Sequence, residues 1–352
     1  MGAVCTCKWM LQRLRRHRRP TVGDSGDEAL PGAEHLQLHL VEMHWRSFLG
    51  GSAATLFALA GLSRDQPVSL LNWCSADTRP DRGLRVVITG SSRELGFSLA
   101  RQFVSLGDAV VISGRTPATL EAATAALRAE FPGCRVLGVQ ADASNAADVE
   151  RLADAAAAEL GGIDVWVCNA GQSQQVKRPL AETAPGELQS IVDTNLMGAL
   201  LGARAAIARM QQQEGGGNVF FVDGNGSWGN PTPGNAAYGA TKRALPQLRD
   251  SLAAEAAAAA AAGGGTGGKV GVHVVSPGMV ATELLFRYAD TPRKARNINI
   301  IAEGPDEVAA WLVPRMRGVE GSGRYIRYLT IPEVLRRYAT ASQRKGRFIP
   351  ED

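Results

Sequence analysis

The stretch RVVITGSSRELGFSLARQFVSLGDAVVISGR, residues 85–115, decides the fold. It starts with a run of β-branched residues, enters a glycine-containing turn and continues through a helical segment to a second apolar run. This order predicts a strand over Arg85–Thr89, a helix over Phe97–Leu106 and a second strand over Ala109–Ser113. Backbone N–H groups of such a turn, at the N-terminus of a helix, can approach a pyrophosphate. The stretch therefore predicts the first βαβ unit of a dinucleotide-binding sheet.

The alternation of short apolar runs and alanine-rich helical segments continues to residue 329, which is typical of a parallel sheet covered by helices. Five further strands are expected at Arg135–Gln140, Ile163–Cys168, Asn218–Val222, Val270–Val275 and Tyr325–Leu329. We predict the α/β class, with a Rossmann-type doubly wound sheet of seven parallel strands in a single main domain over residues 81–330. Residues 1–80 are predicted to be an N-terminal extension and residues 331–352 a C-terminal tail. The alanine run at 256–262 should lengthen a helix, and the glycines that follow it should form a flexible connection.

Composition excludes several classes of protein. The 352 residues are 45% hydrophobic and 20% charged, which argues against a disordered chain. The net charge is +4 and much of it lies in the first 20 residues, so we expect no nucleic-acid binding by the main domain. Five scattered cysteines favour a reducing compartment, and no residue cluster predicts a metal site.

The N-terminal extension carries the targeting signals, and its meaning stays open. No apolar run reaches the length of about 18 residues that a membrane span needs, so we expect no transmembrane segment. The start of the chain is rich in arginine and poor in acidic residues, like an organelle transit peptide. A disordered tail and an N-myristoylated terminus are the alternatives.

Two arginines stand where dinucleotide-binding folds select their cofactor. Folds that prefer NAD place an acidic residue at the end of the second strand, where this chain has Arg115. Arg93 lies within the glycine turn, so the two guanidinium groups could pair with a 2′-phosphate. We therefore predict NADPH rather than NADH. The alternative for each arginine is a solvated surface charge.

Small and polar residues follow the next two predicted strands at their carboxyl ends, where open α/β sheets bind ligands. Asp142 and Ala143 come after the third strand, and Asn169, Ala170 and Gly171 come after the fourth. These five residues are candidates for cofactor binding. Asp142 could instead cap the helix that follows it.

A phenol and an ammonium group lie four residues apart at Tyr238 and Lys242, so they share one face of a helix. A lone pair of this kind is expected by chance in a chain of this length. The pair becomes informative because it stands in an ordered series of other motifs. The series runs through the glycine turn, Asp142, Asn169-Ala170-Gly171, Asn195, a serine, Tyr238 with Lys242, and Pro277-Gly278. With this series the chain resembles the short-chain dehydrogenase/reductase family over about residues 84–329.

The resemblance implies a role for each of these residues. Tyr238 would be the catalytic acid/base, and Lys242 would bind the nicotinamide ribose and lower the pKa of the tyrosine, because an adjacent cation stabilises phenolate. Asn195 would hold a water molecule of a proton relay. The backbone of Val280 and the hydroxyl of Thr282 would hold the carboxamide of the cofactor. The other cofactor-binding residues would be Thr89, Gly90, Ser92, Arg93, Gly96, Arg115, Asp142, Ala143, Asn169, Ala170, Gly171, Pro277 and Gly278.

The chain departs from the family pattern at two places. Glu94 replaces the middle glycine of the turn and brings a carboxylate to the place where phosphates approach; we expect it to point to solvent and pair with Arg93 or Arg101. The family serine usually stands 13 residues before the tyrosine, where this chain has Asn225, whereas Ser227 stands 11 residues before it. We predict that Ser227 polarises the substrate carbonyl, with Asn225 as the alternative donor.

The C-terminal half narrows the resemblance. The sequences around Thr232-Pro233, Asn297–Glu303, Leu312–Arg317 and Tyr328–Thr330 are similar to chlorophyll(ide) b reductases of the non-yellow-coloring type. This resemblance implies a chloroplast enzyme, thylakoid-associated or stromal, that takes part in chlorophyll b degradation. The enzyme would use NADPH to reduce the 7-formyl group of chlorophyll b or chlorophyllide b to a 7-hydroxymethyl group. Its expected partners are the thylakoid surface and a related reductase subunit, in a homo- or hetero-oligomer formed through the helices that carry Asn195 and Tyr238.

A macrocyclic substrate needs a wide apolar cleft. The stretch Leu284–Ile301 could line it as a mobile lid, and Trp228 and Met279 could add stacking surface or be ordinary core and loop residues. Two other functions stay open. One is reduction of another carbonyl, such as a ketoacyl thioester, and the other is non-catalytic cofactor binding, suggested by Glu94 and the displaced serine.

Overall fold

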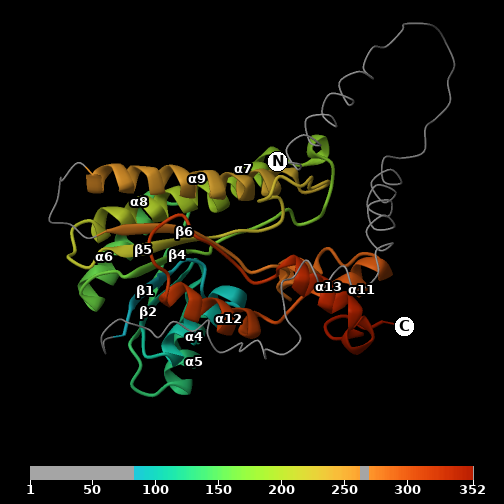
Figure 1. Cartoon of the computed structure of the whole chain (residues 1–352), viewed down its shortest axis with the longest axis horizontal. Coiled ribbons are helices and arrows are strands. Elements are labelled where there is room, and N and C mark those ends of the chain that lie inside the picture. Colours follow the sequence, from blue (N-terminus) through green and yellow to red (C-terminus); the bar gives the residue numbers. More distant parts are fainter. Residues whose placement is uncertain (1–82, 262–268, 352) are drawn as a thin grey trace, which may run out of the picture. The chain divides into compact units, whose positions relative to one another are not determined.

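A computed structural model of the chain describes residues 83–261 and 269–351 (Figure 1). The predictions for residues 1–80 and for the glycine-rich connection at 263–268 lie outside the described residues. Within the described part, seven parallel strands form one sheet in the order β3-β2-β1-β4-β5-β6-β7. The predicted α/β class and the seven-stranded doubly wound sheet are confirmed.

The strands agree with the predicted ones to within a few residues at each end. They are β1 (Arg85–Ile88), β2 (Ala109–Gly114), β3 (Val136–Gln140), β4 (Val165–Cys168), β5 (Gly217–Val222), β6 (Val270–Ser276) and β7 (Tyr325–Arg327). Every residue of β2 and β6 is buried, as expected for parallel strands covered on both faces. The strand order reverses at β1, which pairs with both β2 and β4. Such a reversal opens a crevice at the carboxyl ends of the strands.

Helices cover the two faces of the sheet (Figure 1). One layer contains α4 (Glu94–Ser105), α5 (Pro117–Glu130) and α12 (Pro305–Arg317), and the other contains α6 (Ala146–Leu160), α8 (Gly198–Met210) and α9 (Ala236–Ala261). Each layer packs on its own apolar core; Phe103 is fully buried in the first and Trp166 in the second. The alanine run extends α9 to Ala261, as its composition predicted.

One continuous helical run consists of α7 (Pro185–Val192), the π-helical turn η4 (Asp193–Met197) and α8. Among the described helices, this run alone is long and apolar enough to cross a membrane by length and composition. Since α8 packs on β4 and β5, packing against the sheet also accounts for its apolar residues.

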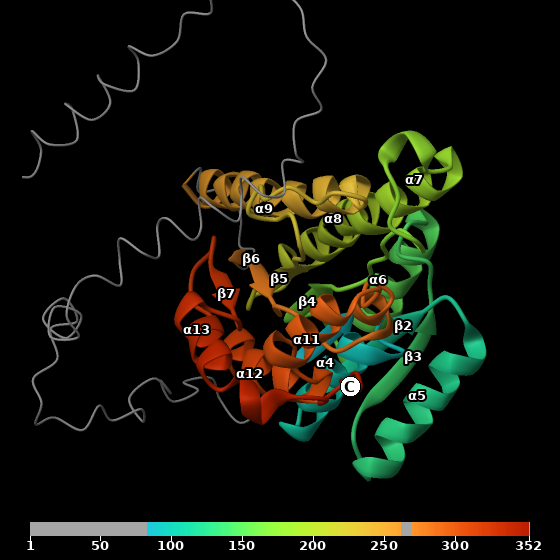
Figure 2. The same cartoon turned by 90° about the vertical axis from the view of Figure 1, so that its right-hand side faces the viewer.

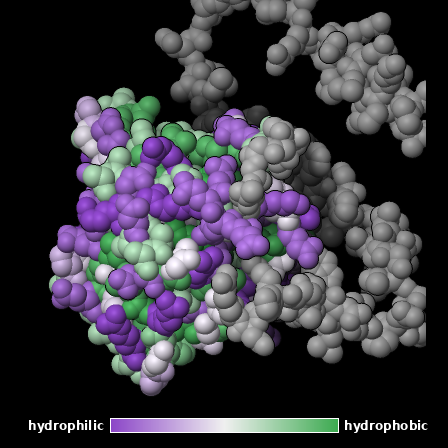
Figure 3. Space-filling view, turned by 90° about the vertical axis from the view of Figure 1, so that its left-hand side faces the viewer, coloured by the Kyte–Doolittle hydropathy of each residue, from purple (hydrophilic) through white to green (hydrophobic). Residues whose placement is uncertain are grey.

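The carboxyl end of the sheet carries the remaining helical segments (Figure 2). They are η3 (Leu180–Glu182), α10 (Glu283–Phe286), α11 (Pro292–Ile301), α13 (Ile331–Ala339) and η5 (Ala341–Arg344). The C-terminal residues fold as α13 and η5 against α11. Figure 3 shows the opposite end, at which hydrophilic and hydrophobic residues are interspersed.

Candidate active site

Small residues shape the turn after β1. Gly90 has a φ of +61°, and a Cβ there would lie 2.9 Å from the Cα of Ala170, while a Cβ at Gly96 would lie 2.4 Å from the carbonyl oxygen of Gly90. The Asn169 amide donates to the carbonyl oxygens of Thr89 and Gly90 at 3.0 and 2.9 Å. The Thr89 hydroxyl oxygen accepts from the N–H groups of Asn169 and Ala170, each at 3.1 Å. The turn is thus held by the residues that follow β4 and leaves the N-terminus of α4 accessible, which fits a dinucleotide.

A cavity of about 970 Å³ lies at the carboxyl ends of the strands. It is lined by nearly all residues predicted to bind the cofactor: Gly90, Ser92, Arg93, Gly96, Arg115, Asp142, Ala143, Asn169, Ala170, Gly171, Lys242, Pro277, Gly278, Val280 and Thr282. Thr89 does not line it, because its side chain lies between β1 and β4. The cavity offers glycines and backbone groups on one side, Arg93 in the turn after β1 and Arg115 at the end of β2, which is a suitable surface for a dinucleotide.

Asp142 remains a cavity residue and not a helix cap. Its Oδ1 atom accepts from the N–H and the hydroxyl of Ser144 at 2.9 and 2.6 Å. Asn145 caps α6 by accepting from the N–H of Asp148 at 3.1 Å. The alternative that Asp142 caps α6 is therefore wrong.

Tyr238 and Lys242 lie on one face of α9 and both line the cavity. The Nζ atom of Lys242 donates to the carbonyl oxygen of Val222 at 2.9 Å and lies 5.7 Å from the centre of the Tyr238 ring. A Cβ at Gly224 would lie 2.1 Å from the Tyr238 hydroxyl, so only glycine leaves room for the phenol. Sequence reasoning did not single out Gly224 as a site residue, although it lies just before Asn225.

The pKa of Tyr238 does not shift in the direction expected from its pairing with Lys242. Burial, together with the carboxylate of Asp223, raises the pKa of Tyr238 above its ordinary value. Burial lowers the pKa of Lys242 to about 8, although Asp223 opposes this shift. The structure does not show the lowered pKa that was predicted for the tyrosine, because desolvation of the phenolate and the Asp223 carboxylate both raise it. A phenol with a raised pKa stays protonated near neutral pH, so its proton is present. It is also a weaker acid, and it donates that proton efficiently only where a nearby cation stabilises the phenolate.

Asn195 lies within the π-helical turn and is buried behind the cavity wall. Its Oδ1 atom accepts from the N–H of Gln172 at 2.8 Å, and its Nδ2 atom donates to the Gln172 carbonyl at 2.9 Å and to the Thr241 hydroxyl at 3.1 Å. Asn195 therefore joins the helical run to the segment after β4 and to α9. Single π-helical turns are frequent at functional sites, and the sequence pattern did not reveal this one.

The structure separates the two candidates for carbonyl polarisation. The Ser227 hydroxyl donates to the carbonyl oxygen of Gly224 at 2.6 Å and accepts from its N–H at 3.1 Å. Ser227 is 2% exposed and does not line the cavity. Asn225 does line it, and its Oδ1 atom accepts from the Nδ2 atom of Asn230 at 2.7 Å. The position of Ser227 does not suit the predicted role, because its hydroxyl is used within the turn.

Glu94 has a different partner from the one expected. It has a φ of +50° and is the only non-glycine residue with positive φ among the described residues. Its Oε1 atom accepts from the N–H of Glu283 at 2.6 Å, whereas Arg93 pairs with Glu283 at 3.4 Å and Arg101 pairs with Glu130 at 2.5 Å. The predicted pairing of Glu94 with either arginine is therefore wrong. The carboxylate connects the glycine turn to the start of α10.

The far half of the cavity is lined by residues from α10, α11 and their flanks. Many are apolar or aromatic, and Arg287, Lys294 and Asn297 add polar groups. The lining residues from this stretch include Leu284, Leu285, Tyr288, Ile298 and Ile301, together with Met279 and Leu329. The Tyr288 hydroxyl donates to the Ser173 hydroxyl at 2.5 Å, which connects this stretch to the segment after β4. The predicted lid segment thus lines the cavity, as expected.

Trp228 and two polar residues that sequence reasoning missed, Asp223 and Arg327, complete this half. Trp228 is 57% exposed, and the guanidinium carbon of Arg327 lies 3.9 Å from the centre of its ring. Asp223 is buried and accepts a hydrogen bond from the hydroxyl of Tyr325; burial raises its pKa. Asp223 follows β5 directly, and this position at the carboxyl end of a strand was the signal that could have identified it.

Comparison with known proteins agrees with this geometry. A family model described as short chain dehydrogenase matches residues 85–292. The chain belongs to the short-chain dehydrogenase/reductase family and is an oxidoreductase with a nicotinamide cofactor. Among its relatives is "Probable chlorophyll(ide) b reductase NYC1, chloroplastic" of Oryza sativa subsp. japonica, which is 40% identical over 88% of this chain and 60% of the relative.

Two further comparisons extend this result. "Chlorophyll(ide) b reductase NOL, chloroplastic" of Arabidopsis thaliana is 39% identical over 76% of this chain and 77% of the relative. A crystal structure of 3-ketoacyl-(acyl-carrier-protein) reductase from Brucella melitensis, complexed with NADH, is 26% identical and aligns with a TM-score of 0.58 over 70% of this chain and 96% of that chain. The chain spans 60% of the length of the rice relative named NYC1 and 54% of the length of the Arabidopsis thaliana relative of the same name.

Proposed function

We propose that this oxidoreductase uses NADPH to reduce the 7-formyl group of chlorophyll b or chlorophyllide b to a 7-hydroxymethyl group. The observation that carries the proposal is the position of Tyr238 in a cavity whose far half is lined by Trp228 and the apolar lid segment. A large flat apolar ring needs such a surface. Similarity to the plant reductases covers 88% of the chain, which exceeds the part matched by the general family model.

The residues of the chain divide the chemistry among them. Bound NADPH would supply a hydride to the formyl carbon. The Tyr238 hydroxyl, which its raised pKa keeps protonated at neutral pH, would donate its proton to the formyl oxygen. The charge of Lys242 would favour the transient phenolate, and Asn195 would fix the segment after β4 on which the cofactor rests.

The choice of NADPH rests on two cavity residues. Arg93 and Arg115 line the cavity at the carboxyl ends of β1 and β2. A 2′-phosphate there would form charge-assisted hydrogen bonds with guanidinium groups. The test is the ratio of kcat/KM for NADPH and NADH in wild type and in Arg115→Asp. We expect wild type to prefer NADPH and the variant to lose most of that preference; a higher kcat/KM with NADH in wild type would contradict the assignment.

The reaction is tested by incubating the purified chain with NADPH and chlorophyllide b and separating the pigments by chromatography. We expect 7-hydroxymethyl product with wild type and at least about a hundredfold slower formation with Tyr238→Phe, because general acid catalysis contributes about 10²–10⁴-fold. Binding of NADPH without product from any formyl pigment would overturn the pigment assignment. Turnover of a ketoacyl thioester in its place would favour the other reductase function.

The place of action follows from the same relatives. Both are named chloroplastic, and we infer a chloroplast location at or near the thylakoid, where the pigment is held. We also infer assembly into a homo- or hetero-oligomer through the helices that carry Asn195 and Tyr238. Exposed apolar side chains at Val192, Met197 and Leu200 support this inference.

A further inference from the structure

The helix α13 presents its apolar side to solvent and its charged side to the protein. Ile331, Leu335 and Tyr338 are 71%, 45% and 44% exposed, whereas Arg337 is 2% exposed. The spacing of the three apolar residues places them on one face of the helix, which we name the α13 face. An amphipathic helix on a water-soluble surface normally has the opposite orientation. The reversed orientation indicates that the α13 face contacts something other than water.

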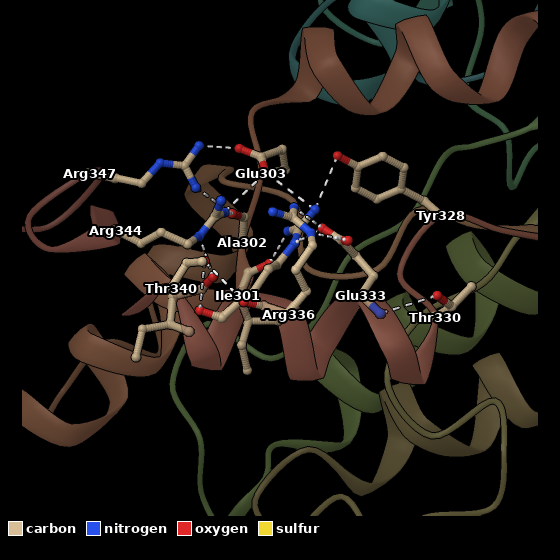
Figure 4. A network of polar contacts seen from close by, with 12 residues as sticks. Ile301, Ala302, Glu303, Tyr328, Thr330, Glu333, Arg336, Thr340, Arg344 and Arg347 are labelled. Carbon is tan, nitrogen blue, oxygen red and sulfur yellow. Dashed lines mark hydrogen bonds and ion pairs between the residues drawn. The ribbon is translucent and has the colours of Figure 1, made fainter. Parts of the chain in front are cut away.

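Ionic contacts hold α13 in this orientation (Figure 4). Arg337 pairs with Glu333 at 2.7 Å and with Glu303 at 3.3 Å. The Glu303 carboxylate also accepts from Arg344 at 3.0 Å and from Arg347. Charge-assisted hydrogen bonds of this kind are the stronger ones in proteins. The exposure of the α13 face is therefore built into the packing of the C-terminal residues.

The α13 face adjoins the rim of the cavity. The Tyr338 hydroxyl donates to the Oδ1 atom of Asn297 at 3.4 Å, and Asn297 lines the cavity. Asn297 belongs to α11, whose residues Ile298 and Ile301 also line the cavity. A surface that covers the α13 face would therefore lie next to the lid segment.

The charge around the α13 face distinguishes between possible partners. Residues 290–303 and 331–352 contain eight lysines or arginines and five acidic residues, which leaves a net charge of +3. Arg293 and Arg296 of α11 are exposed, and so is Lys345. A second copy of the chain would bring these like charges together, which is unfavourable. Anionic lipid headgroups would neutralise them, while apolar side chains enter the boundary between headgroups and acyl chains.

We propose that the α13 face and the basic residues of α11 dock on an anionic lipid bilayer. The contact places the rim of the cavity at the membrane surface, where an apolar substrate is available. The docking itself does not depend on which carbonyl the enzyme reduces. Binding can therefore be measured without turnover.

The first test is sedimentation of the full chain with vesicles of phosphatidylcholine, with and without about 30% phosphatidylglycerol. We expect binding to the anionic vesicles that weakens as salt is raised, because salt screens the basic residues. The variant Ile331→Ser/Leu335→Ser/Tyr338→Ser should bind at least about tenfold more weakly, because it loses the apolar contact. The matched variant Leu106→Ser/Val176→Ser/Leu180→Ser changes three exposed apolar residues elsewhere and should bind like wild type.

Hydrogen exchange then shows whether α13 itself makes the contact. We expect amides of residues 331–345 to exchange more slowly when anionic vesicles are added to wild type. Equal vesicle binding by the two variants, or unchanged exchange in α13, would overturn the proposal. So would an oligomer in sedimentation velocity that dissociates only in the α13 variant, which would indicate a second copy as partner. Protection of these amides before vesicles are added would indicate that another segment of the chain covers the face.

Discussion

Burial of the Tyr238 phenol and the Lys242 ammonium group decides their titration. Burial raises the pKa of the phenol and lowers that of the ammonium group to about 8. The phenol is therefore protonated through the neutral range, while the lysine carries its charge only below about pH 8. A reductase needs the protonated phenol together with the charged lysine.

We expect kcat/KM for reduction to fall as pH rises through about 8. Lys242 has a lowered pKa of about 8, so it is charged below this value and neutral above it, where it no longer favours the phenolate. Initial rates of NADPH oxidation between about pH 6 and 10 measure the profile. An alkaline limb that lies two pH units higher would contradict this assignment.

The variant Asp223→Asn provides a second test of the assignment of the alkaline limb to Lys242. The Asp223 carboxylate raises the pKa of Lys242, so its removal should move the alkaline limb to lower pH. The control Glu255→Gln removes an exposed carboxylate from α9, the helix that carries Lys242. It should leave the alkaline limb of the pH profile in place.

Strain at Glu94 gives a prediction about stability. Because an L-residue with positive φ costs about 1–2 kcal/mol, Glu94→Gly should be more stable than Glu94→Ala by about this amount. Both variants lose the hydrogen bond to the N–H of Glu283, so their difference isolates the backbone. Chemical denaturation measures the free energies of unfolding. Equal stability of the two variants would show that the turn relaxes.

The turn between β5 and α9 carries Ser227 and Asn225, the two candidates for polarising the substrate carbonyl, and variants of both test their roles. Ser227→Ala removes two hydrogen bonds to Gly224 and should lower stability by about 1 kcal/mol. Asn225→Ala should lower kcat by about tenfold to a hundredfold with little loss of stability, if its amide stabilises the developing oxyanion. Kinetics and denaturation of both variants separate these effects. A larger loss of kcat in Ser227→Ala at unchanged stability would restore Ser227 to the predicted role.

At the scale of elements, the C-terminal helices depend on one carboxylate. Glu303 follows α11 and accepts bonds from arginines of α13, η5 and the residues after it. Burial raises the pKa of Glu303, but hydrogen bonds from Arg347 and Arg344 outweigh it, so the pKa lies below its usual value. The carboxylate is therefore charged at neutral pH and balances three guanidinium groups.

We expect Glu303→Gln to reduce the free energy of unfolding by about 3 kcal/mol, because it leaves the buried Arg337 with less compensating charge. Urea denaturation measures this change, and Glu320→Gln, at an exposed position, should have little effect. If the two variants were equally stable, the network in Figure 4 would not anchor the C-terminal residues.

At the scale of the whole molecule, one helical face beside the site has no partner among residues 83–261 and 269–351. Val192, Met197 and Leu200 are exposed on the run from α7 to α8, although α8 packs on the sheet with its other side. An apolar face of this kind favours the subunit interface proposed above.

Leu200→Arg should therefore convert the oligomer to monomers, because it places a charge in an apolar interface. Sedimentation velocity measures the change, and Leu106→Arg is a matched control at a similarly exposed leucine. A wild-type chain that is already monomeric at micromolar concentration would contradict the interface.

Much of the site followed from the order of motifs, because the carboxyl ends of parallel strands meet at one edge of a sheet. Gly90, Asp142, Tyr238 and Lys242 were therefore expected to line one cavity, and they do. The partner of Glu94 was not expected, because it comes from α10, which lies 189 residues further along the chain.

The sequence by itself determined the sheet, the glycine turn and the face of α9 that carries Tyr238 and Lys242, because these depend on local periodicity and on spacing within one element. Only the tertiary structure decided the direction of the pKa of Tyr238 and the use of the Ser227 hydroxyl inside its own turn. It also decided that the α13 face points to solvent. Burial and ionic contacts between distant segments control these properties, and no local pattern of residues encodes them.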